Sequence, residues 1–210
     1  SCDGRMGGEA GGDGSLAARR AVAARRGSEW LVAHQGEMDR DWAFAVFSYL
    51  RPIAPDPELA RDFRRIRDEA AREPFVAMPA DLRDPSVLEL PTLHPIVAEL
   101  LRRKRMGEPY QDPAAQLDAL FRAHPEFWQD TTPAQQASLL DSFSALGIDP
   151  GWTLADCVQR LRSRWRENDP ERLLAHAPFV FGLTHVVYAA SGYFARYPDP
   201  AAFAPERAML

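Results

Sequence analysis

The sequence lacks the spacings that mark most common catalytic and metal-binding sites. It contains no HExxH, no pair of CxxC motifs, no GxxxxGK[ST] loop and no GxSxG elbow. Recognisable zinc sites, P-loops and hydrolase nucleophiles are therefore excluded. It also lacks GxGxxG after a strand and the aspartate-rich cluster that binds diphosphate through magnesium in terpene synthases. We accordingly expect no cofactor and no metal ion.

Cysteine is scarce as well, with Cys2 and Cys157 the only two in 210 residues. Their placement argues against a disulfide framework and predicts a reducing, cytoplasmic setting. No secretory signal is expected, because no charged segment followed by an apolar core opens the chain. A lipoprotein remnant around Cys2 is the alternative. The net charge of −5 argues against nucleic acid as the main partner.

Strand patterns are missing too, and PFVAM at 74–78 is the single candidate. Helical signals are common instead. A capping Asp or Thr followed by proline occurs at Asp56-Pro57, Asp112-Pro113, Thr132-Pro133 and Asp169-Pro170. After Pro57, the residues Leu59, Phe63, Ile66 and Ala70 form one apolar stripe at helical spacing. The sequence predicts an all-α fold of helical hairpins, in a bundle or a partial α/α toroid.

Several boundaries follow from local composition. Residues 1–14 hold six glycines and no aromatic residue, which predicts a disordered tail, and residues 15–210 are predicted to form a single helical domain. Ser15 is expected to cap a helix that Gly27 ends. A later helix is expected to begin at Pro95 and to end in RRKR at 102–105, where cations face the negative helix terminus. The five tryptophans are expected to fill the core.

The least polar segment is FVFGLTHVVYAASGYF at 179–194. As a helix, its roughly 16 residues would span about 24 Å, and this is shorter than the roughly 20 residues that a helix needs to cross a bilayer core. We therefore expect no membrane span. The segment is predicted to be a central helix of the bundle, surrounded by its neighbours. Phe181, His185, Tyr188 and Gly192 fall on one face of it.

This face supplies the candidate site. His185 and Tyr188 are the candidate catalytic residues, as an acid or base and as a hydrogen-bond donor. We expect His185 to be buried and neutral, because desolvation lowers the pKa of an imidazole. A carboxylate from another helix, such as Asp141 or Asp156, would reverse that shift. In the alternative interpretation His185 and Tyr188 are hydrogen-bonded core groups without a ligand.

The same face supplies three candidate ligand-binding residues. Phe181 lies one turn before His185 on it. The Thr184 hydroxyl is expected to bond back to the Val180 carbonyl. Gly192, which has no side chain, is expected to leave space beside Tyr188 for a small apolar ligand.

Three short segments carry a resemblance to a known family. LVAH at 31–34, LGID at 146–149 and LTHVVY at 183–188 together resemble an uncharacterised family of all-helical actinobacterial proteins. The resemblance covers roughly residues 28–198 and is specific around the LTH helix. It implies helical hairpins in a partial α/α toroid, with no reaction attached. The family often has an acid near the position of Gly192, which this chain lacks.

Two functions of different classes follow. In the first, the chain is a helical small-molecule-binding protein with a pocket near His185. The composition, rich in Ala, Arg and Pro, associates it with natural-product pathways as an enzyme or accessory protein. In the second, it is a non-catalytic interaction or scaffold module. The first predicts a cavity that touches His185 and Tyr188, and the second predicts a filled core there and an exposed apolar groove elsewhere.

Overall fold

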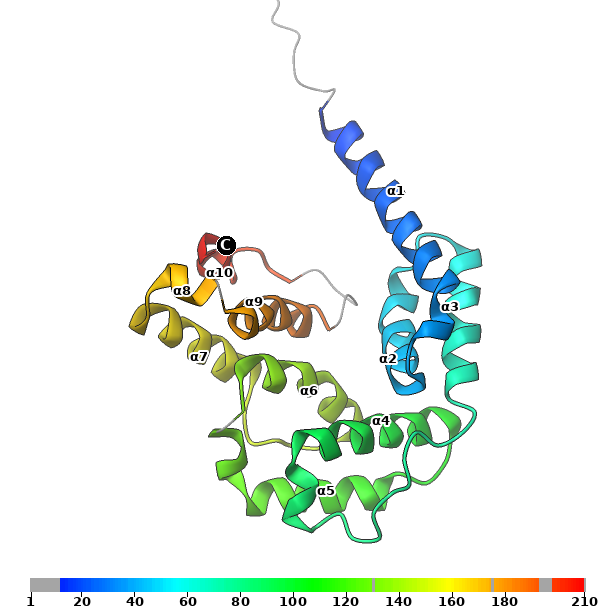
Figure 1. Cartoon of the computed structure of the whole chain (residues 1–210), viewed down its shortest axis with the longest axis vertical. Helices are drawn as coiled ribbons and strands as arrows, with labels where there is room; N and C mark the ends of the chain where they lie inside the picture. Colours follow the sequence, from blue (N-terminus) through cyan, green and yellow to red (C-terminus); the bar gives the residue numbers. More distant parts are fainter. Residues whose placement is uncertain (1–11, 130, 175, 193–197, 210) are drawn as a thin grey trace, which may run out of the picture. The chain divides into compact units, whose positions relative to one another are not determined.

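The computed structural model describes residues 12–129, 131–174, 176–192 and 198–209 (Figure 1). Within these ranges every regular element is a helix, so the all-α prediction is confirmed. The candidate strand at 74–78 is irregular. None of the described helices is both long and apolar enough to cross a bilayer. The chain forms two compact units, residues 1–70 and 71–210, and the expected single domain over 15–210 stays a prediction.

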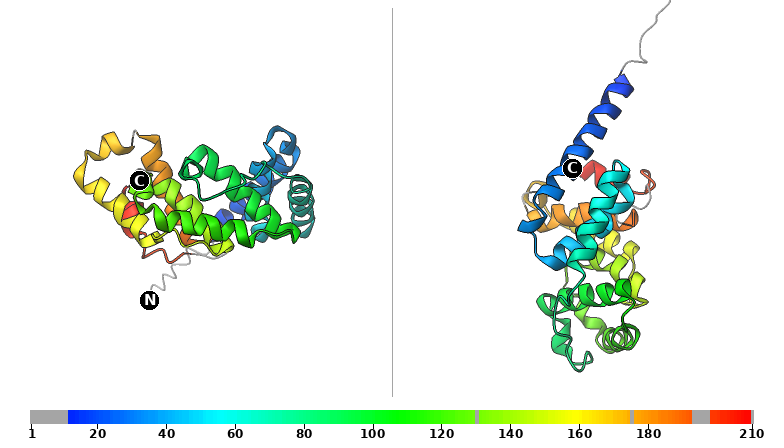
Figure 2. Two further views of the ribbon diagram at one scale, coloured as in Figure 1. Left: turned by 90° about the horizontal axis from the view of Figure 1, so that it is seen from below. Right: turned by 90° about the vertical axis from the view of Figure 1, so that its right-hand side faces the viewer.

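The first unit is built on a helical hairpin. Its helices are α1 (Gly12–Ala33), α2 (Arg40–Leu50) and α3 (Pro57–Ala70). Helices α2 and α3 pack side by side (Figures 1 and 2). The rings of Phe47 and Phe63 meet between them with centroids 5.3 Å apart. The stripe predicted for α3 is confirmed, because its four apolar residues are buried.

Helix α1 is longer than the sequence predicted. It begins at Gly12, so residues 12–14 are helical and not part of a disordered tail. Residues 1–11 of that predicted tail lie outside the described residues. Gly27 does not end the helix, which continues to Ala33, and Gly27 does not adopt the left-handed conformation that glycine often has at a helix end. The Arg25 Nε donates to Glu29 Oε1 at 2.8 Å across this glycine, and such a pair stabilises a continuous helix.

The second unit holds the remaining helices. They are α4 (Leu90–Met106), α5 (Gln111–Ala123), α6 (Pro133–Leu146), α7 (Leu154–Glu167), α8 (Pro170–Leu174), α9 (Ala177–Ala190) and α10 (Ala204–Met209). Short 3₁₀ turns at Gln35–Glu37, Arg51–Ile53, Pro85–Leu88 and Pro125–Gln129 complete the described helical elements of the two units.

Helix α6 is the central helix of the second unit. Its Leu139, Phe143 and Leu146 belong to a large core shared with α4 and α5. Its Ala137 belongs to a second core shared with α7 and α9. Because α6 faces two cores, its buried positions extend around most of its circumference. Residues 179–194 were predicted to form the central helix, and that prediction is wrong because α6 lies between the two cores.

Local capping explains where several helices begin and end. The Asp56 carboxylate accepts from the amides of Glu58 and Leu59, each at 2.9 Å, so α3 begins at Pro57 as predicted. Two predicted starts are wrong. Helix α5 begins at Gln111, so Pro113 lies in its first turn. Proline is tolerated there because the backbone amides of a first turn have no partner within the helix. Helix α4 begins at Leu90 and runs through Pro95.

Helix starts and ends elsewhere follow the sequence. Thr132 and Gln135 form a reciprocal capping box at the start of α6. The Asp169 carboxylate accepts from the Glu171 amide at 3.1 Å where α8 begins. Gly147 adopts φ 75° beyond α6, which ends that helix as expected.

An ionic cluster in the second unit includes Arg102, the first residue of the RRKR segment that was predicted to face the negative helix terminus. Arg102 is only 1% exposed and donates to both carboxylate oxygens of Glu99, at 2.8 and 2.9 Å. It also reaches Glu108 at 2.5 Å and the Ala71 carbonyl at 3.3 Å. The Phe75 amide donates to Glu99 at 2.9 Å. Arg102 therefore fixes the start of the second unit against α4, a role beyond the predicted pairing of RRKR with the helix terminus.

Candidate functional site

The candidate face of α9 points outward from its own unit. Phe181 is 60% exposed and Tyr188 is 36% exposed, whereas His185 is partly buried. The buried face of α9 consists instead of Phe179, Gly182, Leu183 and Val186, packed against α6 and α7. The prediction that His185 is buried is therefore wrong. The helix has core contacts on one side only, which a uniformly apolar sequence does not reveal.

His185 is held within a short aromatic row. Its ring stacks on Phe181 with centroids 4.4 Å apart, and the Tyr188 ring meets it edge-on at 5.9 Å. The His185 Nδ1 lies 2.8 Å from the Phe181 carbonyl oxygen one turn earlier. In the tautomer with a proton on Nδ1 this is a donated hydrogen bond, which leaves Nε2 as an acceptor. The arrangement orients the ring and also holds the Phe181 ring in place.

The other two candidate residues differ from expectation in detail. The Thr184 hydroxyl donates to the Phe181 carbonyl at 2.9 Å and not to Val180. Helix α9 ends at Ala190, and Gly192 follows with φ 57°. Gly192 is therefore a left-handed turn residue beyond the helix and does not continue the face of Phe181 and Tyr188. A left-handed φ is the conformation that glycine adopts without steric cost.

No acid completes a catalytic pair with His185 in the described ranges. Asp141 makes no ion pair with it, and burial raises the pKa of the Asp141 carboxyl. Asp156 instead accepts from the Thr153 hydroxyl at 2.8 Å and caps α7, and hydrogen bonds from Thr153 lower its pKa. The part of the chain that is described also contains no group of three His, Cys, Asp or Glu side chains placed to hold a metal.

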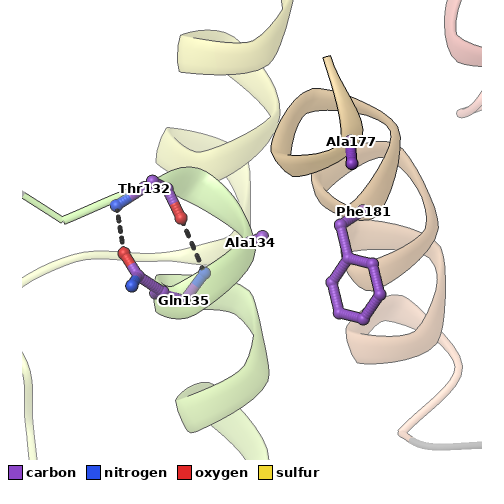
Figure 3. A pocket seen from close by; sticks show the side chains of 5 residues that line it. All are labelled: Thr132, Ala134, Gln135, Ala177 and Phe181. Atoms are coloured by element: carbon purple, nitrogen blue, oxygen red, sulfur yellow. Dashed lines mark hydrogen bonds between the residues drawn. The ribbon is translucent and has the colours of Figure 1, made fainter. Parts of the chain in front are cut away.

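A groove of about 380 Å³ lies between the first turns of α6 and α9 (Figure 3). It is open to solvent and mostly apolar. Its lining residues are Thr132, Ala134, Gln135, Ala177 and Phe181. In Figure 3 the two helices start at the same end, and the Phe181 ring lies on the side of α9 that faces α6. The groove thus includes one candidate residue, Phe181, and neither His185 nor Tyr188 lines it.

The polar groups at this groove are largely occupied. The Thr132 amide donates to the Gln135 side-chain oxygen at 2.8 Å, and the Gln135 amide donates to the Thr132 hydroxyl at 3.2 Å. These bonds satisfy the helix terminus. Thr132 was predicted to start a helix and was not predicted to belong to the site. The Thr-Pro-x-Gln spacing indicates a capping box, but nothing in it indicates that α9 lies beside it.

A comparison of the chain with protein-family models, curated protein sequences and solved structures finds no match in any of the three. The candidate site therefore stands on its own geometry.

Proposed function

We propose that the second unit is a non-catalytic protein-interaction module, whose docking site is the groove between α6 and α9. The observation that carries the proposal is the 60% exposure of Phe181 at an apolar groove. Exposed aromatic side chains next to concave apolar surface are typical anchors of protein interfaces.

The surroundings of Phe181 support this role. Its ring stacks on His185, whose Nδ1 lies 2.8 Å from the Phe181 carbonyl. Few side-chain torsions of Phe181 then remain to be fixed when a partner binds. A preorganised anchor of this kind loses less conformational entropy on association. Because the capping box uses polar groups of Thr132 and Gln135, the groove favours apolar side chains over polar ligands.

A small apolar ligand is the second candidate occupant. The supporting observation is the size of the groove, about 380 Å³, which falls within the range of about 300–1,000 Å³ for small-molecule sites. Because the groove is open and does not reach His185, the geometry favours a peptide segment over an enclosed ligand. An enzyme or accessory role in a natural-product pathway would additionally require His185 to act on the bound molecule.

The test selects displayed 12-residue peptides against the full chain and titrates the synthetic peptides by calorimetry. We expect apolar peptides, with affinity reduced about tenfold or more by Phe181→Ser. Leu174→Ser on α8, another exposed large apolar residue, is the matched control and should leave the affinity within about twofold. Equal binding by Phe181→Ser would contradict the proposal.

The same variants separate the second candidate. If a library of small apolar molecules yields ligands that depend on Phe181 while no peptide does, the groove is a ligand site. If turnover of such a ligand is lost in His185→Asn and His185→Phe while both proteins keep their stability, the catalytic hypothesis is restored.

A further inference from the structure

The outward side of α1 in the first unit carries a basic surface. Residues 14–28 contain four arginines and no acid. Residues 16–27 are all exposed, and this part of α1 extends beyond α2 and α3 (Figures 1 and 2). A helix normally gains most of its stability from packing one face against a neighbour. Over residues 16–27, no face of α1 is packed against a neighbouring helix of its unit.

The residues on this side have the spacing of a helix-pairing seam. Leu16, Ala23 and Trp30 recur every seven residues, which places them on one face. Arg20 and Arg26 flank that face, and neither forms an ion pair with a described residue. By contrast, Arg25 points to the other side, where it pairs with Glu29 and with Asp56 at 3.3 Å.

Two features suit this seam to close contact with another helix. Ala23 and Gly27 are small, and a Cβ added at Gly27 would meet nothing within 4 Å. Trp30 is 56% exposed, and its ring stacks on His34 with centroids 4.3 Å apart. Tryptophan and arginine are the residues most enriched at the energetic centres of interfaces.

We propose that the basic seam of α1, formed by Arg20, Ala23, Arg26 and Trp30, binds an acidic amphipathic helix of a partner protein. Glutamates flanking an apolar stripe on that helix would pair with Arg20 and Arg26, while the stripe packs on Ala23 and Trp30. Such charge pairs at the flanks of a seam determine the choice of partner.

Charge and shape disfavour the other occupants. If the seam paired with the same seam of a second copy, two arginine clusters without acids would lie together and repel each other. The chain carries −5 and this stretch alone carries +4, so the rest carries −9 and would repel a long polyanion such as nucleic acid. A membrane surface requires a broad apolar face, but Val22 lies on a different side of the helix from Leu16 and Trp30.

The experiment uses the full chain and a labelled three-heptad peptide with leucine at the seam and glutamate at the flanking positions, followed by fluorescence anisotropy. We expect a Kd below about 100 μM that weakens with added salt. Arg20→Glu combined with Arg26→Glu should weaken binding about tenfold or more, and so should Trp30→Ala. Arg61→Glu combined with Arg64→Glu on α3 makes the same charge change at exposed positions and should leave binding within about twofold.

Four outcomes overturn the proposal. They are an absence of binding, equal binding of a scrambled peptide of the same composition, equal loss in the α3 control, and tighter binding to a DNA or RNA duplex or to phosphatidylserine vesicles. Self-association through α1 at the concentrations used, measured by analytical ultracentrifugation, would assign the seam to a second copy instead.

Discussion

Two phenylalanines of the second unit show how differently the same side chain can be used. Phe143 on α6 is fully buried, and its ring lies 5.1 Å from that of Phe121. Phe181 on α9 is largely exposed. We expect Phe143→Ala to lower the free energy of unfolding by about 3–5 kcal/mol, because it removes a packed ring and leaves a cavity.

Phe181→Ala provides the matched control for urea denaturation, since the same atoms are removed from a solvated position. Phe181→Ala should lower the free energy of unfolding by no more than about 0.5 kcal/mol. Similar losses for the two variants would show that the Phe181 ring is covered in solution.

Cys157 is a buried thiol with little nucleophilic character. Burial, the largest cause, raises its pKa to about 12 despite the nearby Arg160, and the Sγ lies 3.8 Å from the Gln136 side-chain oxygen. Thiol reagents attack the thiolate. We expect a Cys2→Ser protein to react with a thiol reagent only as fast as it unfolds, and rapidly in denaturant. Fast reaction of the native protein would show that Cys157 becomes accessible.

At the scale of elements, α6 and α9 show that burial does not follow composition. Six of the fourteen residues of α6 are Gln, Ser or Asp, whereas α9 is almost entirely apolar. Helix α6 lies between two cores, whereas α9 contributes to one of them. The aromatic row of α9, with Phe181 and Tyr188 exposed, therefore faces outward.

Close packing of α9 on α7 depends on Gly182. A Cβ added there would lie 2.9 Å from Leu161 Cδ2, and Leu161 is itself buried and has little room to move. We expect Gly182→Val to destabilise the protein by about 1–3 kcal/mol in urea denaturation, because it overpacks this contact.

Gly27→Val on α1 is the corresponding control, since an added Cβ there meets nothing within 4 Å. Valine has a higher helix propensity than glycine, so the control should not be destabilising. An unchanged stability of Gly182→Val would show that the Leu161 side chain can move aside without cost.

At the scale of the whole molecule, the Glu99–Arg102 cluster links the start of the second unit to α4. Burial alone raises the pKa of Glu99, but the hydrogen bonds from Arg102, the Phe75 amide and Arg103 outweigh it and lower that pKa overall. A lowered folded-state pKa contributes stability above the unfolded value of about 4.3, and this contribution is lost as pH falls through the folded-state value.

We expect Glu99→Gln to cost about 3–5 kcal/mol at pH 7, because Arg102 keeps a buried charge with one strong partner removed. The difference from wild type should shrink as the pH falls below about 4. Urea denaturation at a series of pH values measures it. A difference that is constant with pH would show that the pKa of Glu99 is the same in the folded and the unfolded protein.

The sequence by itself determined the features that depend on contacts within about four residues. The capping aspartate of α3, the capping threonine of α6, the glycine beyond α6 and the apolar stripe of α3 were all predicted, because caps and helical periodicity are local. The boundaries of α1 and α4 were less predictable, since Gly27 and Pro95 weaken a helix without always ending it.

The tertiary structure alone decided which face of each apolar helix is covered. Nothing local distinguishes Phe179, which is buried, from Phe181, which is exposed two residues later. Burial of Arg102 likewise depends on Glu108 and Ala71, which lie outside its helix. The candidate site followed the same division: the sequence selected α9 and Phe181, and Phe181 lines the groove. The groove beside it exists only because α6, some forty residues earlier, packs against α9.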